Sequence, residues 1–300
     1  MRLISGGFRA RGLAGAAVVA VAMGALASSG PVGAAEANRP ALALGDRVVF
    51  GFITQAGYMY RNPDNFVGFP EHYGPDLRLQ VTNVSCPGET SGSLISIVNP
   101  DHGCQAFRGF APLHVSYTGS ELDYAGWFLR HHHNTRLVSL LIGANDAFLL
   151  QDHCANNPGC IQAGLPALLL QLGKNLDTTF AALHNAGFRG VLVVGNYYSL
   201  NYGDAGATGL VQLLNATIKA RTLAAGGVVA DDFMAFKTVA SAPSAGGDSC
   251  KAGLLNATPD PAKQLTCDVH PSQSGQEVLA RAFEDAFLAA GEGEGGRSDS

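Results

Sequence analysis

The segment "ALALGDRVVFGF" (residues 41–52) places a continuous apolar run directly before a Gly-Asp pair. An uninterrupted apolar run of this length indicates a buried strand, as found in parallel sheets that are covered on both faces. Gly45 and Asp46 then indicate a turn, because both residue types favour turns. In parallel sheets functional groups gather outside the carboxyl ends of the strands. Arg47, which follows the turn, is therefore a candidate site residue.

Strand-like and helix-like segments alternate along the rest of the chain. The helical segments show amphipathic spacing, and several of them end at a glycine. We expect strands at 77–85, 135–146, 189–200 and 228–236, and helices at 120–132, 165–188, 209–227 and 272–291. Apolar strands that alternate with helices predict an α/β fold, a three-layer α/β/α sandwich around a parallel sheet.

Composition limits the classes of protein to which the chain can belong. Of the 300 residues, 47% are hydrophobic and only 14% are charged, which favours a globular domain with a substantial core. The formal net charge of −5 argues against nucleic acid as a partner. Because no repeat or proline-rich linker divides the chain, we expect one domain over 38–291. The polar, glycine-rich end at 292–300 predicts a disordered tail.

The first 37 residues have the features of a secretory signal peptide. A basic start precedes an apolar stretch of mostly Ala and Gly at 13–27, and small residues follow at 31–37. The stretch is short and weakly hydrophobic, which favours export and cleavage over a permanent anchor. We therefore expect a secreted, extracellular protein with no stable membrane insertion after cleavage. The Ala- and Gly-rich composition indicates bacterial export.

The cysteine count supports an oxidising compartment. Six cysteines are an even number, and in exported proteins such cysteines usually form disulfides. Proximity in the sequence predicts the pairs Cys86–Cys104, Cys154–Cys160 and Cys250–Cys267. A zinc site is the competing interpretation, but the cysteines are scattered and no CxxC pair is present. The run "HHHN" (131–134) is also a poor metal site, since adjacent side chains point in different directions.

Polar residues at the predicted strand ends suit acyl-transfer chemistry. Such a site needs a nucleophile, a base that takes its proton, and donors aimed at the developing oxyanion. His270, between an acidic residue and Pro271 at a helix start, is the candidate base. Asn145 offers an amide donor, and Gly88 offers a backbone N–H that a ligand can approach closely. The backbone N–H of residue 47 would complete the donor set.

Four blocks of the sequence together resemble the SGNH, or GDSL-type, hydrolase family. They are "ALGDRVVFGF", "NVSCPGETS", "IGAND" and "DVHPSQSG", in this order, and the resemblance extends from about residue 42 to about residue 275. It implies a flavodoxin-like α/β sandwich and hydrolysis of carboxylic esters without a metal or other cofactor. The expected partner is a small-molecule ester, a lipid or an acylated sugar. We expect a monomer.

Within this resemblance, Gly88 and Asn145 match the oxyanion-hole residues and His270 matches the catalytic base. The position of the nucleophilic serine is occupied by Arg47. A guanidinium stays protonated and cannot attack a carbonyl, so we expect very poor ester hydrolysis. Arg47 could be a sequence variant, or it could bind an anion such as a fatty-acid or sugar carboxylate in a non-catalytic cleft. Alternatively, another hydroxyl such as that of Ser85 could act as the nucleophile.

The residue that orients His270 is also unusual. The family has an aspartate three residues before the histidine, whereas this chain has Cys267 there and Asp268 one residue later. Either Asp268 reaches His270, or a backbone carbonyl near Cys267 orients the ring. A Cys250–Cys267 disulfide would stiffen the segment that presents His270.

Overall fold

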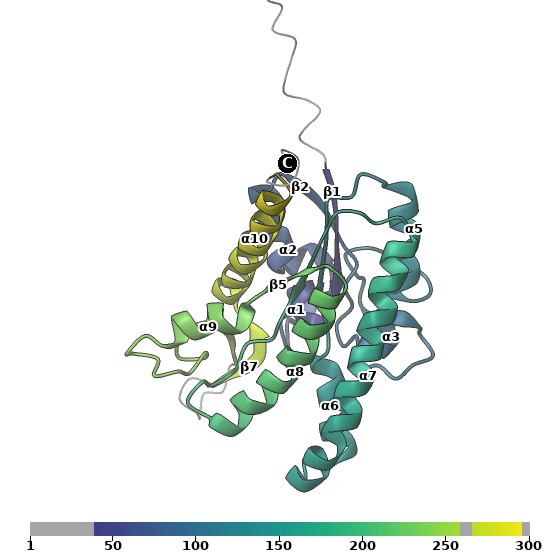
Figure 1. Cartoon of the computed structure of the whole chain (residues 1–300). Helices are drawn as coiled ribbons and strands as arrows, with labels where there is room; N and C mark the ends of the chain where they lie inside the picture. The colour runs from purple at the N-terminus through teal and green to yellow at the C-terminus, as the bar shows by residue number, and fades with distance from the viewer. Residues whose placement is uncertain (1–38, 259–265, 296–300) are drawn as a thin grey trace, which may run out of the picture. The chain divides into compact units, whose positions relative to one another are not determined.

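The computed structural model describes residues 39–258 and 266–295 of the chain (Figure 1). Its centre is a parallel sheet with the strand order β2-β1-β3-β4-β5. The strands are β1 (Arg39–Gly45), β2 (Leu79–Asn83), β3 (Leu137–Leu141), β4 (Val191–Gly195) and β5 (Val228–Ala230). This is the flavodoxin-like order, and it confirms the predicted α/β/α sandwich. The signal peptide expected at 1–37 lies outside the described residues.

Helices cover both faces of the sheet (Figure 1). One face carries α2 (Phe69–Asp76) and α10 (Gln273–Gly295), with α9 (Asp232–Ala240) beside α10. The other carries α3 (Ser91–Ile95), α5 (Glu121–His131), α7 (Pro158–Asn185) and α8 (Ala205–Ala224). Shorter elements complete the described fold: α1 (Arg47–Phe50), α4 (Cys104–Phe110), α6 (Ala144–His153), the 3-10 turns η1 (Gly57–Arg61) and η2 (Pro63–Asn65), and the antiparallel hairpin of β6 (Leu255–Thr258) and β7 (Thr266–Pro271).

Burial on both faces explains the continuous apolar runs of the central strands. All five residues of β3 are buried, and β1 is buried from Pro40 onward. On the face of α2 and α10, the rings of Phe69 and Tyr73 pack against Phe283 at 4.3 and 6.2 Å between centroids. The one polar side chain of β3, Ser139, is satisfied by the Tyr73 hydroxyl at 2.7 Å. The core therefore holds no unpaired polar group at this point.

Several element boundaries differ from those expected. The segment predicted as a strand at 228–236 is a strand only to Ala230, because Asp231 then caps α9 by accepting the Met234 N–H. The helix expected at 165–188 already begins at Pro158. The strand expected at 135–146 ends at Leu141, and "GAND" opens helix α6. Helix α10 continues through 292–295, which we had expected to belong to the tail; residues 296–300 lie outside the described residues.

All three predicted disulfides are present. Cys86–Cys104, Cys154–Cys160 and Cys250–Cys267 join Cα atoms 5.4, 5.6 and 5.7 Å apart, which is normal disulfide geometry. Proximity in the sequence was therefore sufficient to predict the pairing. In 39–258 and 266–295, no helix combines the length and the apolarity that crossing a membrane requires.

Asp232, at the start of α9, is a buried carboxylate whose oxygen atoms have no hydrogen-bond partner in the described residues. Its side chain is fully buried. Its Oδ2 atom and the ring of Phe283 both lie close to Gly195. Burial, and secondarily the charge of Asp231, raise the pKa of Asp232 well above its usual value. The folded chain consequently keeps a proton here that the unfolded chain releases above about pH 4.

This difference predicts that Asp232 lowers stability increasingly as the pH rises. Asp232→Asn removes the titrating group and keeps nearly the same shape. It should increase the free energy of unfolding at pH 8 by about 1–3 kcal/mol, and by less at pH 5. Urea unfolding at both pH values, with the disulfides intact, measures the difference.

The control for this prediction is Asp177→Asn. Asp177 is exposed and pairs with Arg221 at 3.2 Å, so its replacement should change stability by less than about 1 kcal/mol at either pH. If Asp232→Asn shifted the unfolding curve equally at pH 5 and pH 8, the proposed titration of Asp232 would be wrong.

Candidate functional site

The candidate site lies where the strand order reverses, between β1 and β3. Arg47 follows β1, Asn145 follows β3, and ligands of open α/β sheets bind at this reversal. The turn after β1 depends on Gly45, which has a φ of +139°. A side chain here would collide with the carbonyl oxygen of Leu141 on β3. The absence of a side chain lets the Asp46 N–H donate to that same carbonyl at 3.3 Å.

Asp46 connects the ends of three strands through its buried carboxylate. Oδ1 accepts the Val48 N–H at 2.9 Å and so caps α1. Oδ2 accepts the Tyr197 hydroxyl at 2.6 Å and the Asn145 amide at 3.4 Å. Burial raises the pKa of Asp46, although the bonds from Tyr197 and Val48 oppose the shift. Tyr197 thus helps to position the turn.

Arg47 extends its guanidinium toward Asn145 and the loop that carries His102. Nη1 donates to Asn145 Oδ1 at 2.8 Å, and Nη2 donates to the His102 carbonyl oxygen at 2.7 Å. Nη1 also lies 3.3 Å from His102 Nδ1. Because a guanidinium only donates, Nδ1 must accept, and the ring proton is then on Nε2, which faces Asp152 at 3.1 Å. His102 and Asp152 were not predicted as site residues.

The charge of Arg47 has no direct counter-ion in the described part of the chain. No carboxylate oxygen there lies within 4.0 Å of the half-buried guanidinium. Burial lowers the pKa of Arg47, and the more distant charges of Asp46 and Asp101 oppose this shift. An arginine remains protonated at neutral pH even so. The site therefore holds a positive charge whose direct contacts are hydrogen bonds to neutral groups.

The predicted oxyanion residues lie beside Arg47, but Asn145 is turned away from the role expected for it. Its Nδ2 donates to the Glu89 carbonyl at 2.8 Å, while Oδ1 accepts from Arg47. This orientation is unambiguous, since the carbonyl only accepts and the guanidinium only donates. Gly88, with a φ of +94°, packs against the backbone at His102. Its N–H and that of Arg47 have no hydrogen-bond partner among residues 39–258 and 266–295.

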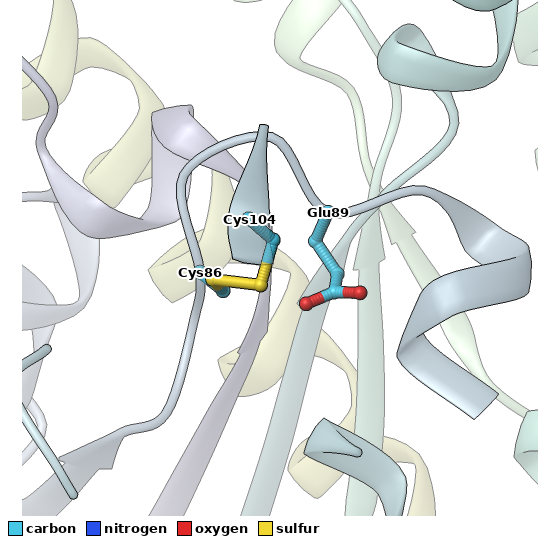
Figure 2. A group of neighbouring side chains, drawn as sticks. All are labelled: Cys86, Glu89 and Cys104. Carbon is cyan, nitrogen blue, oxygen red and sulfur yellow. A yellow bond between two sulfur atoms is a disulfide. The ribbon is translucent and has the colours of Figure 1, made fainter. Parts of the chain in front are cut away.

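The loop that carries Gly88 is closed by the Cys86–Cys104 disulfide, with the Glu89 carboxylate next to the sulfur atoms (Figure 2). These three side chains bring ligand-type atoms within 4.8 Å of one another. However, both sulfurs are joined to each other, so neither can act as a metal-binding thiolate. Burial raises the pKa of Glu89 to about 7, against the hydrogen bond from Ser93. The group fixes the loop and offers no metal site in this state.

His270 lies on β7 and is held by Asp268. The Asp268 Oδ2 atom is 3.4 Å from His270 Nδ1, and Oδ1 accepts the His270 N–H at 2.8 Å. Thr54 Oγ1 lies 3.3 Å from the same Nδ1. Burial acts to raise the pKa of Asp268, but the bonds from His270 and Thr54 outweigh it and the pKa falls below its usual value. Of the two orienting groups considered, the Asp268 carboxylate is therefore the one in contact.

Phe52 connects the two halves of the site. Its ring centroid lies 5.0 Å from that of His270 and 5.9 Å from the Arg47 guanidinium carbon. Ser85, the alternative nucleophile, is fully buried and its hydroxyl donates to Asn83 at 2.5 Å. No contact with His270 supports a catalytic role for it. Thr54 was missed because it lies outside the four sequence blocks. Phe52 ends the first block, but nothing in the block marks it as a site residue.

A cavity of about 240 Å³ opens from Arg47, Asn145 and His270 into a space between α6, α7 and α8. Apart from this polar end it is mainly apolar; the side chains that line its far part include Phe148, Leu165, Leu168, Leu210, Val211 and Leu214. Its size is slightly below the range typical of small-molecule sites. The shape and lining suit a short apolar chain whose polar end meets Arg47.

Comparisons of the sequence give no match to any family model and none to a curated protein. Solved structures do match. The lipase Lip_vut3 from a goat rumen metagenome has a TM-score of 0.53 at 14% identity, over 83% of this chain and 97% of that protein. A catalytic mutant of Axe2, an acetylxylan esterase from Geobacillus stearothermophilus, has a TM-score of 0.50 at 15% identity, over 83% and 94%.

These identities are too low to transfer an activity, but the matches extend over nearly the whole of each solved protein. They support the α/β fold that the strand order describes. The chain thus has the α/β fold of the SGNH-type lipases and esterases.

Proposed function

We propose that this chain is an exported protein that binds a carboxylate with an apolar chain in the cleft of an SGNH hydrolase scaffold, and that it hydrolyses esters very poorly. One observation carries the proposal. The nucleophile position holds the Arg47 guanidinium, at the polar end of an apolar cavity and without a direct counter-ion in the described residues. The three disulfides support export, because such bonds persist in oxidising compartments.

The charge of Arg47 favours an anionic ligand. A partly buried cation without a counter-ion is unfavourable, and an incoming carboxylate supplies the missing charge. The bonds to Asn145 and His102 engage three of the five guanidinium N–H groups. The others are available for charge-assisted bonds to a carboxylate. The unpartnered backbone N–H of Arg47 is a further donor on the same turn.

The apolar lining of the cavity favours an acyl chain over a sugar. A sugar in this space would place hydroxyl groups against side chains such as Leu165, Leu168 and Leu214, which offer no hydrogen bonds. An acyl chain, in contrast, gains free energy from each methylene that it removes from water. Between the two carboxylates considered from the sequence, the fatty-acid type fits this cavity better.

Poor hydrolysis follows from the same residues. Arg47 offers no hydroxyl, and it also engages Asn145 Oδ1, which keeps the amide donor directed at Glu89. Thr54 has a hydroxyl near His270, but on the Nδ1 side that faces Asp268. The Asp268–His270 pair is nevertheless intact, which supports a hydrolase origin for the site. Restoring a serine therefore tests how much of the catalytic arrangement remains.

We expect octanoate to bind the purified, disulfide-intact chain saturably in isothermal titration calorimetry. Arg47→Gln should weaken this affinity about 10- to 100-fold, because a charge-assisted pair is lost. The affinity for octan-1-ol, which lacks the charge, should change much less. Arg130→Gln, on the exposed side of α5, is the matched control and should change neither. Absence of binding for both octanoate and galacturonate would refute the carboxylate site.

Arg47→Ser should give the scaffold a nucleophile. We expect hydrolysis of a short-chain aryl ester to rise about 10³-fold or more above that of the native chain, and to return to the starting level in Arg47→Ser/His270→Ala. Initial rates measured with 4-nitrophenyl butyrate test this. The proposal would be contradicted if the native chain hydrolysed the ester at ordinary serine-esterase rates and His270→Ala abolished that activity. An inactive Arg47→Ser variant would show that the rest of the arrangement is not catalytic.

A further inference from the structure

A row of aromatic side chains runs along the outer side of α5. Tyr124, Trp127 and His131 follow one another at helical spacing, with ring centroids 5.3 and 4.7 Å apart. Tyr117, from the preceding loop, extends the row at 5.6 Å from Tyr124. Trp127 is the only tryptophan of the chain and its side chain is 46% exposed. The row therefore places aromatic ring surface in contact with solvent along one side of α5.

Two grooves flank this row. One, of about 430 Å³, is lined by Ser116, Tyr117, Thr118, Asp123, Tyr124 and Trp127. The other, of about 340 Å³, is lined by Pro40, Gln80, Thr82, Tyr124, Trp127, Phe128, His132 and Asn134. Both volumes fall in the range of small-molecule sites. Trp127 and Tyr124 form the shared wall between the two grooves.

The polar groups of the grooves are free to bind a ligand. In the described part of the chain, no hydrogen bond engages five of the polar side chains that line them, namely Gln80, Thr82, Ser116, Thr118 and Asn134. The lining also includes the Asp123 carboxylate, whose Oδ2 atom accepts the Ser120 N–H at 3.0 Å in the capping box of α5. The grooves thus offer five neutral polar side chains beside aromatic faces, with Asp123 as the one carboxylate in their lining.

We propose that this surface binds a neutral oligosaccharide, with one pyranose ring stacked on Trp127. A pyranose has an apolar C–H face, which matches the aromatic row, and a rim of hydroxyl groups, which matches the free amides and hydroxyls on either side. A purely apolar partner would leave these polar groups buried and unpaired, which is costly. Because neutral amides and hydroxyls outnumber the single carboxylate in the lining, the ligand that complements it is uncharged.

The proposed sugar site is distinct from the Arg47 site. Pro40 and Gln80, which line one groove, lie near the beginning of β1 and β2, whereas Arg47 follows the end of β1. Helix α5 covers one face of the sheet (Figure 1), and its residues Trp127 and Phe128 line the same groove as Pro40 and Gln80. None of the groove residues lines the apolar cavity. The surface would therefore hold a carbohydrate without contact to the carboxylate site.

Trp127 is its own reporter, since any tryptophan emission of the chain comes from it alone. We expect xylohexaose or cellohexaose to change the emission of the purified, disulfide-intact chain saturably, and xylose to act only at much higher concentration. Tyr124→Ala should weaken the affinity about tenfold or more, by removing half of the stacking wall. Tyr58→Ala, which removes an aromatic side chain that is 82% exposed on η1, is the matched control and should change nothing.

Calorimetry of Trp127→Ala locates the site independently of the fluorescence, with circular dichroism to confirm that the variant is folded. Loss of hexasaccharide binding in Trp127→Ala, with binding retained in Arg47→Gln, supports the proposal. Hexasaccharide binding that Trp127→Ala leaves intact would overturn it, as would the absence of binding for both hexasaccharides. Sedimentation velocity completes the test, because a dimer that Trp127→Ala dissociates would assign the row to a second copy of the chain instead.

Discussion

The buried carboxylate of Asp46 is the contact on which the site depends. It binds Val48 at the start of α1, Tyr197 after β4 and Asn145 after β3. Three loops that are far apart in the sequence are thereby fixed to one acceptor. Such an arrangement is stable only because donors surround the carboxylate, since an unpaired carboxylate at this depth would be very unfavourable. The direction in which Arg47 leaves the turn is a consequence of this network.

The same network explains why an arginine can occupy a position suited to a small side chain. Its long side chain leaves the turn and places the guanidinium against the His102 carbonyl and Asn145 Oδ1. Both acceptors are neutral, so they orient the cation without cancelling its charge. A carboxylate in either place would have formed an ion pair and neutralised the charge of Arg47. The loop closed by Cys86–Cys104 therefore orients the Arg47 guanidinium without neutralising it, and the charge remains available to a ligand.

What the sequence could predict was governed by local patterns. The apolar runs at β1 and β3 and the residues at their ends were recognisable because each is contiguous, and the sheet order then brings Arg47 and Asn145 together. His102 and Asp152 could not be found in this way, because the contact of His102 with Arg47 and that of Asp152 with His102 join distant segments. The segment at 228–236 was misassigned because a short apolar run fits a strand or a buried helix equally well. The Asp231 cap was the available signal for a helix there.

An oxyanion site and a carboxylate site differ in when the negative charge of the ligand is present. A hydrolase of this fold directs donors at a negative charge that exists only in the transition state, and binds the neutral ester more weakly. A permanent cation at the same place instead favours a ligand that is negative in its ground state. The carboxylate product of ester hydrolysis is such a ligand. Under the proposed function, Arg47 thus converts a site for a transient charge into one for a stable anion. The apolar cavity between α6, α7 and α8 needs no change for this, because the acyl chain of an ester and that of its carboxylate are the same.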